Sequence, residues 1–185
     1  MKVIITGATG FVGGAVLKRC IADSRIDQIV VLSRRDLQES LKESAKVTIL
    51  ILESFTAYEP EILERLAGAH ACLWYVSSCS VFVESTRLIN RALGLKGAPM
   101  GYTDKAAAEQ IDVSYPTAAA RAFAEHLAPH LGKNQPFRFV LCSGIGAELD
   151  PAALCWVMDE TRKLKVRQIS QVSVYPVSTD ERIPS

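Results

Sequence analysis

The segment Thr6-Gly7-Ala8-Thr9-Gly10-Phe11-Val12-Gly13 decides the fold of this chain. It follows a short β-branched run, Val3–Ile5, and opens a stretch with helical spacing of apolar residues over 11–22. Short apolar runs bounded by glycine predict buried strands. A strand, a glycine turn and a helix in direct succession are typical of a βαβ unit that binds a dinucleotide.

The three glycines have the spacing GxxGxxG, and each has a separate expected role. Gly7 permits the tight turn out of the strand, Gly10 lets the backbone approach a pyrophosphate, and Gly13 lets the helix pack closely. Amides at the start of the helix then point at the phosphates, helped by the helix dipole. The alternative is a purely structural turn. The predicted cofactor-binding residues of this turn are Gly7, Thr9, Gly10, Phe11, Val12 and Gly13.

Strands and helices alternate along the rest of the chain. Further apolar runs predict strands at residues 29–32, 47–52, 71–76 and 137–142, and helical patterns fall at 58–66, 84–93, 116–131 and 151–164. Continuous apolar strands separated by helices predict an α/β domain, a parallel sheet covered on both faces. Right-handed crossovers make it a doubly wound sheet with the strand order 3-2-1-4-5.

Size and composition restrict the class of protein. The chain has 185 residues, 49% of them apolar, which suits one domain over residues 1–165 with a divergent tail over 166–185, including a strand at 172–177. The net charge of +1 does not favour nucleic acid as a partner. There is no apolar run of the roughly 20 residues that a membrane span needs and no secretory signal, so we expect a cytoplasmic protein. The five cysteines form no CxxC pair, which favours buried reduced thiols over a metal site.

The residues after the second strand indicate which dinucleotide is bound. An acidic residue there would favour NAD, because it accepts from the ribose 2′-hydroxyl and repels a 2′-phosphate. This chain has Ser33, Arg34 and Arg35 instead, and guanidinium groups bind phosphate in a bidentate manner. The sequence therefore predicts NADP, with NAD as the alternative, and the nearby Asp36 weakens the preference.

The glycine turn, the strand that ends in Ser-Arg-Arg and the run Phe139-Val140-Leu141-Cys142-Ser143-Gly144 resemble the short-chain dehydrogenase/reductase superfamily. The likeness is to its extended and atypical epimerase-like members, and among these to small fungal reductase-like proteins. The resemblance implies a Rossmann fold with NAD(P) along the strand ends. It also implies a homodimer, and cofactor contacts from Glu53, Ser54 and Ser77 after the third and fourth strands.

The same resemblance implies a catalytic serine, tyrosine and lysine. Ser143 matches the serine position, and Lys165 lies near the lysine position. The family's YxxxK arrangement is missing, because Trp156 stands about where the tyrosine belongs and an indole N–H cannot take up a proton.

Three interpretations stay open at this stage. The first is an NADP-dependent oxidoreductase or epimerase-like enzyme of atypical site chemistry, acting on a small carbonyl or alcohol. The second is an inactive NADP-binding sensor or scaffold. The third is a truncated product, because residues 81–102 and 166–185 depart from the family pattern in a way that a divergent protein or a misassigned splice junction explains equally.

Overall fold

The computed structural model describes residues 1–37, 44–76, 105–132 and 135–142, together with residues 167, 169, 171 and 172. The helices predicted at 84–93 and 151–164 lie outside the described residues. Within the described ranges, no helix is long and apolar enough to cross a bilayer.

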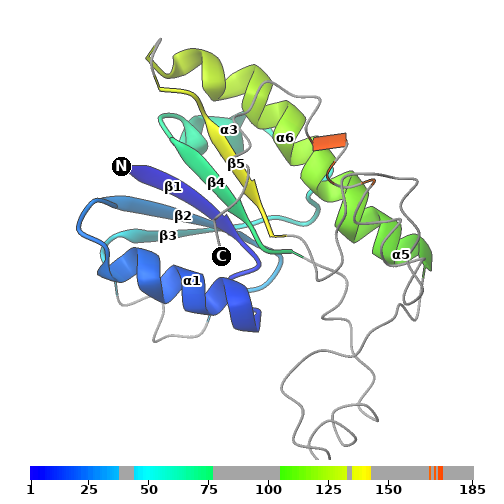
Figure 1. Ribbon diagram of the computed structural model, residues 1–185, viewed down its shortest axis with the longest axis horizontal. Coiled ribbons are helices and arrows are strands. Elements are labelled where there is room, and N and C mark those ends of the chain that lie inside the picture. Colours follow the sequence, from blue (N-terminus) through cyan, green and yellow to red (C-terminus); the bar gives the residue numbers. More distant parts are fainter. Residues whose placement is uncertain are drawn as a thin grey trace, which may run out of the picture.

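The core of the fold is a parallel sheet (Figure 1). The order β3-β2-β1-β4-β5 confirms the predicted doubly wound arrangement. Strands β2 and β4 flank β1, with Ile5 opposite Val31 on one side and Leu73 on the other. The five strands are β1 (Lys2–Thr6), β2 (Gln28–Ser33), β3 (Val47–Ile51), β4 (Ala71–Trp74) and β5 (Arg138–Leu141).

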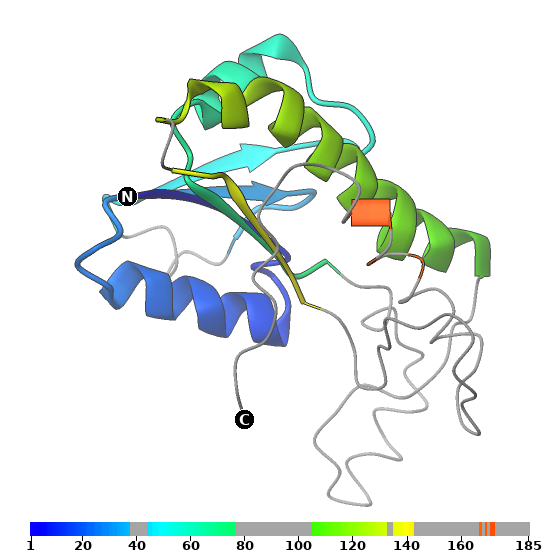
Figure 2. The same ribbon diagram turned by 45° about the horizontal axis from the view of Figure 1, so that its top comes forward.

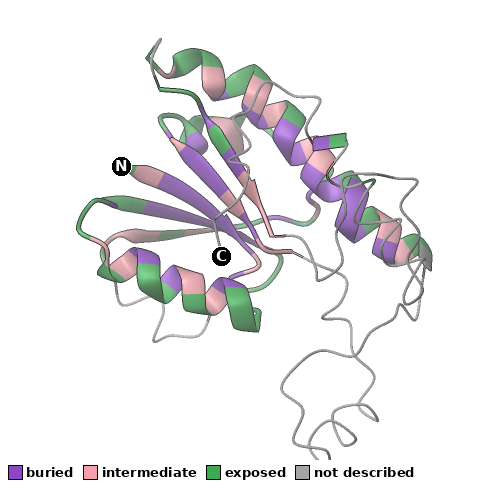
Figure 3. Cartoon of the chain, viewed as in Figure 1, coloured by how far each residue is buried: buried purple, intermediate pink, exposed green. Residues whose placement is uncertain are grey.

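Helices cover both faces of the sheet (Figure 2). Helix α1 (Phe11–Ala22) lies on one face, where Leu17 and Cys20 pack against alternate strand residues such as Ile5. Helix α3 (Pro60–Leu66) and helix α6 (Tyr115–His126) lie on the other face. Strands β1, β2 and β4 are buried along most of their length (Figure 3), because each contributes apolar side chains to both cores.

The core beside α3 and α6 is rich in aromatic rings. Trp74 packs edge-on against Phe55 and stacks on Phe139, with ring centroids 5.6 and 5.8 Å apart. Among the described residues, two polar atoms in this core, the Tyr58 hydroxyl and Trp74 Nε1, are buried without a hydrogen-bond partner.

A long helix leads into α6 and contains a π turn. Helix α5 (Lys105–Glu109) continues through the π segment Gln110–Ser114 into α6, and the Tyr115 amide donates to the carbonyl of Gln110. Pro116 is the physical reason for the π turn. Proline has no N–H to donate to the carbonyl four residues earlier, and in a regular α-helix its ring would collide with that carbonyl. The expected helix start at 116 was therefore wrong. The helix also ends earlier than predicted, and a 3-10 turn at Ala128–His130 holds Pro129.

Three described residues beyond residue 165, namely Arg167, Gln171 and Val172, contact the folded unit. Val172 is helical and 1% exposed within the core beside α6, so the strand expected from this residue does not begin there. Arg167 forms an ion pair with Glu109, and the hydroxyl of Thr117 donates to Gln171.

Candidate nucleotide-binding site

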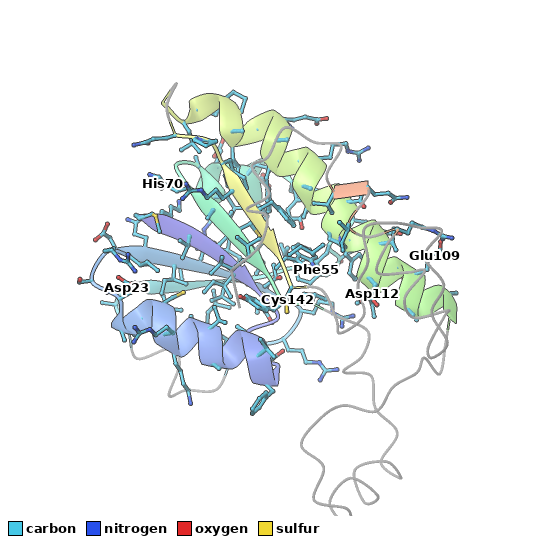
Figure 4. All side chains as sticks on the ribbon, viewed as in Figure 1. Asp23, Phe55, His70, Glu109, Asp112 and Cys142 are labelled. Carbon is cyan, nitrogen blue, oxygen red and sulfur yellow. The ribbon has the colours of Figure 1, made fainter. Side chains whose placement is uncertain are left out.

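The carboxyl ends of the parallel strands bring the glycine turn and the predicted Arg34 to one edge of the sheet, together with Tyr75 and Cys142, which the sequence did not single out. Gly7 follows β1, Arg34 follows β2, Tyr75 follows β4 and Cys142 follows β5. Figure 4 shows Cys142 at this edge and His70 at the opposite one, before β4. The order of strands reverses between β1 and β4, and ligands of such sheets bind in the crevice outside this switch point.

Two glycines of the turn are required by the fold itself. Gly7 has a φ of +70°, and a Cβ there would lie 2.6 Å from the carbonyl oxygen of Tyr75. A Cβ on Gly13 would lie 2.2 Å from the carbonyl oxygen of Gly7. The helix therefore packs onto the backbone of the turn at Gly13, and both positions exclude larger residues even without a ligand.

Gly10 is different, because little in the protein occupies the space of its missing side chain. It is exposed and has an extended backbone, and within the described part of the chain a Cβ would meet only the carbonyl oxygen of Gly7, at 3.3 Å. The Gly10 amide donates to that same oxygen, at 2.9 Å. A glycine here leaves an open approach to the backbone, which suits a ligand that comes close to the main chain.

The first amides of α1 face this open approach. The first helical hydrogen bond joins the Gly14 amide to the Gly10 carbonyl, so the amides of Phe11, Val12 and Gly13 precede it. Gly10 supplies no side-chain cap, and the first turn carries no acidic residue. Such a helix start is suited to an anion, which the amides and the helix dipole both stabilise.

A hydrogen bond that the sequence did not predict supports the turn. Thr6 is fully buried, and its hydroxyl oxygen accepts from the Tyr75 amide at 3.1 Å. Burial raises the pKa of Tyr75, and negative charge on Cys142 and Cys20, where they ionise, raises it further. The sequence holds one signal for this role of Thr6, namely that it is a polar residue at the end of an otherwise apolar strand.

The predicted ribose-phosphate residues lie at the end of β2. Ser33 is buried, and its hydroxyl oxygen accepts from the Arg35 amide at 3.2 Å, which fixes the turn that carries both arginines. Arg34 and Arg35 are exposed, and neither guanidinium has an ion pair within the described residues. The positive charge at this edge is therefore available to an anionic ligand.

The remaining predicted residues divide into two groups. Glu53 is exposed after β3, and the hydroxyl of the half-buried Ser54 accepts from the Thr56 amide at 3.2 Å in a local turn. Ser77, Ser143 and Lys165, as well as Trp156, lie outside the described residues. Within the described ranges, no group of acidic, histidine and cysteine side chains could hold a metal ion.

One curated protein is similar to this chain in sequence. No family model matches the sequence. It is 30% identical over 146 residues to the leucinostatins biosynthesis cluster protein T of Purpureocillium lilacinum, an alignment that covers 79% of this chain and 44% of that protein. The chain thus spans less than half the length of this relative.

Two solved structures are similar over nearly the whole chain. UDP-glucuronic acid 4-epimerase from Bacillus cereus, in complex with NAD, matches 95% of this chain at a TM-score of 0.63 and 12% identity. Yeast methylglyoxal/isovaleraldehyde reductase, complexed with NADPH, matches 94% at a TM-score of 0.65 and 12% identity. This chain covers 52% of each of these proteins.

The chain has the Rossmann fold of these enzymes. The predicted Rossmann fold is therefore confirmed. At 12% identity the likeness carries no further than the fold, so the ligand has to be argued from this chain's own residues.

Proposed function

We propose that this chain binds NADP(H) at the carboxyl edge of its sheet and belongs to an oxidoreductase or epimerase-like protein acting on a small carbonyl or alcohol. The observation that carries the proposal is Gly10, whose missing side chain leaves the first amides of α1 open. The neighbouring fold supports it, because the similar structures were solved with NAD or NADPH.

Each part of the dinucleotide has a candidate partner in this chain. The diphosphate would take hydrogen bonds from the amides of Phe11, Val12 and Gly13. The 2′-phosphate would lie against Arg34 and Arg35, which are exposed and have no acidic partner within the described ranges. When bound, the cofactor would supply or accept a hydride, and the protein would bind and orient it.

The test is a fluorescence titration of the purified chain with NADPH and with NADH. We expect saturable binding that favours NADPH. Replacement of both arginines by serine should remove most of this preference while leaving NADH binding nearly unchanged. Equal and non-saturable signals for both dinucleotides would contradict the proposal.

Gly10→Ala is the matched variant for the diphosphate site. Among the described residues the added methyl group meets only the carbonyl oxygen of Gly7, at 3.3 Å, so the fold should persist, as circular dichroism would show. We expect the Kd for NADPH to rise about tenfold or more, which corresponds to about 1.4 kcal/mol. Unchanged affinity would show that the dinucleotide does not approach the backbone at Gly10.

A binding module without turnover is the second candidate, and the missing YxxxK arrangement favours it. The two candidates differ in one measurement. An enzyme oxidises NADPH in the presence of a reducible aldehyde or ketone from a broad panel, whereas a sensor binds NADPH equally well and leaves it unchanged.

A further inference from the structure

The C-terminal end of α1 lacks the features that usually stop a helix. Residues 22–27 contain no glycine, the residue that most often caps a helix at this end. In the last turn Ile21 is half-buried and Ala22 is exposed, so burial holds this turn weakly. The last carbonyl groups of a helix have no partner within the helix, so those of α1 need partners from elsewhere.

A lysine next to another strand supplies these partners. Lys46 directly precedes β3, and its ammonium group donates to the carbonyl of Ile21 at 3.1 Å and to that of Asp23 at 3.0 Å. The helix dipole favours a cation at this end as well. The carbonyl of Lys46 accepts from the Ile29 amide at 2.8 Å, which fixes the backbone of the lysine beside β2. Lys46 therefore clamps the end of α1 to the amino edge of the sheet.

A second lysine makes the same kind of clamp on the other face of the sheet. Lys2, at the start of β1, donates through its ammonium group to the carbonyls of Arg65 at 2.7 Å and Ala67 at 2.8 Å, at the end of α3. Helix α3 carries none of the residues that the proposed function assigns to the dinucleotide. The two clamps are alike in chemistry, and only the clamp from Lys46 acts on the helix of the proposed site.

The two ends of α1 are connected through one short helix. The close packing of Gly13 on Gly7 holds its first turn, and Lys46 holds its last. Leu17 and Cys20 are its other buried residues. A helix of 12 residues is about 18 Å long and is marginal on its own, because helix formation is cooperative. The order of its first turn therefore depends in part on what holds its last turn.

We propose that Lys46 is a positioning residue for the nucleotide site, because its clamp on the last turn of α1 keeps the amides of the first turn in order. This inference rests on the proposed function. Lys46 acts through the helix and does not touch the dinucleotide. Figure 4 shows Asp23, whose carbonyl it binds, away from Cys142 at the carboxyl edge. Because such coupling is reciprocal, a bound dinucleotide should also stabilise the last turn of α1.

The experiment compares Lys46→Met with Lys2→Met, which removes the matching clamp from α3. Methionine keeps much of the length of lysine and has no charge or donor. Both variants should lower the melting temperature. Only Lys46→Met should raise the Kd for NADPH, by about fivefold, which is at the low end of typical coupling between sites. Lys46→Arg keeps a cation with several donors and should restore most of the affinity.

Amide hydrogen exchange gives a second measurement that needs no ligand. The Gly14 amide makes the first helical hydrogen bond of α1, to the carbonyl of Gly10. Its exchange should become faster in Lys46→Met and stay the same in Lys2→Met, because local opening of the first turn controls it. In the unmodified chain, NADPH should slow exchange in the last turn of α1.

Two results would overturn the inference while leaving the proposed function intact. One is an unchanged Kd for NADPH in Lys46→Met. The other is an equal rise of the Kd in Lys46→Met and Lys2→Met, which would reflect a general loss of stability. If the unmodified chain binds no dinucleotide, the proposed function itself fails. The exchange rate at Gly14 then still decides whether Lys46 orders the first turn, and an unchanged rate in Lys46→Met would show that it does not.

Discussion

The hydroxyl oxygen of Thr6 accepts a hydrogen bond from the amide of Tyr75, at 3.1 Å, and so joins the carboxyl ends of β1 and β4. The ladder pairing between these strands extends only to Ile5 and Leu73. The side chain of Thr6 therefore continues the connection one step further, beneath the turn that starts at Gly7. Tyr75 in turn presents its carbonyl to Gly7, so the turn, the strand end and this hydroxyl form one unit.

Thr6→Val tests this unit, because valine has nearly the same shape and no hydroxyl. The half-buried Tyr75 amide would lose its partner, which costs about 1 kcal/mol of the free energy of unfolding. Urea denaturation measures this loss. Thr6→Ser keeps the oxygen and is the control, and it should retain most of the stability. Equal stability of the valine and serine variants would show that the bond contributes nothing.

Gly13→Ala should prevent the chain from folding normally. A methyl group there would lie 2.2 Å from the Gly7 carbonyl oxygen, and this neighbour is backbone that cannot turn aside. The matched control is Gly132→Ala, where no described residue lies within 4 Å of the added carbon. We expect a loss of several kcal/mol or insoluble protein for Gly13→Ala and a change within about 0.5 kcal/mol for Gly132→Ala. Soluble Gly13→Ala protein with an unchanged melting temperature would contradict the close packing of helix and turn.

The sequence predicted the local features of this site better than the features that join distant residues. The glycine spacing predicted the turn, and α1 has the expected bounds, Phe11–Ala22. Continuous apolar strands were enough to predict the sheet order. The bond between Thr6 and Tyr75 could not be predicted, because 69 positions separate the two residues and no pattern links them.

Pro116 shows the other way in which sequence reasoning fell short. A proline early in an alanine-rich stretch indicates a helix start. In the structure the helix passes through it, because a π turn removes the conflict with the preceding carbonyl. This turn accompanies the burial of Asp112, the one charged side chain among the described residues that is fully buried. Local helix propensity does not predict this π turn, since tertiary packing stabilises it.

Stability should fall as the solution becomes alkaline. Burial raises the pKa of the Cys72 thiol and of the Tyr58 phenol, so the folded chain keeps these protons. The unfolded chain releases them near its ordinary values, about 8.5 for cysteine and about 10 for tyrosine. The contribution of these two groups to the free energy of unfolding is thus fully present below about pH 8. It declines at higher pH, because the unfolded state then binds fewer protons than the folded state.

Cys72→Ala isolates one of these two groups. Each ionising group contributes a slope of about 1.4 kcal/mol per pH unit, so the variant should show a shallower decline between about pH 9 and about pH 10. Urea denaturation along this range measures the slope. A small loss at neutral pH is expected from the missing sulfur, and it does not affect the slope. The same slope with and without the thiol would show that Cys72 ionises equally in both states.

Val172 should contribute to stability although it lies beyond the predicted domain boundary. Its side chain is 1% exposed in the core beside α6, so Val172→Ala should cost about 1–2 kcal/mol through lost burial and the space left behind. Gln171→Ala is the control, since Gln171 is exposed and its bond to Thr117 is a surface contact. Denaturation curves of the two variants should differ clearly. If Val172→Ala unfolds at the same denaturant concentration as Gln171→Ala, residue 172 does not belong to the core.

Tyr58→Phe should leave the chain as stable as before or make it more stable. A buried hydroxyl without a partner gives up its hydrogen bonds to water and gains none in the protein, which costs about 1–3 kcal/mol. Phenylalanine removes this oxygen and keeps the ring, whose centroid lies 5.1 Å from that of Phe123. Tyr58→Ala is the control, and it should lose about 3–5 kcal/mol because the ring itself fills the core. Thermal unfolding of both variants measures the two effects separately. A clear drop in melting temperature for Tyr58→Phe would mean that the hydroxyl has a partner in solution, such as a buried water, and that the polar atom contributes to the core.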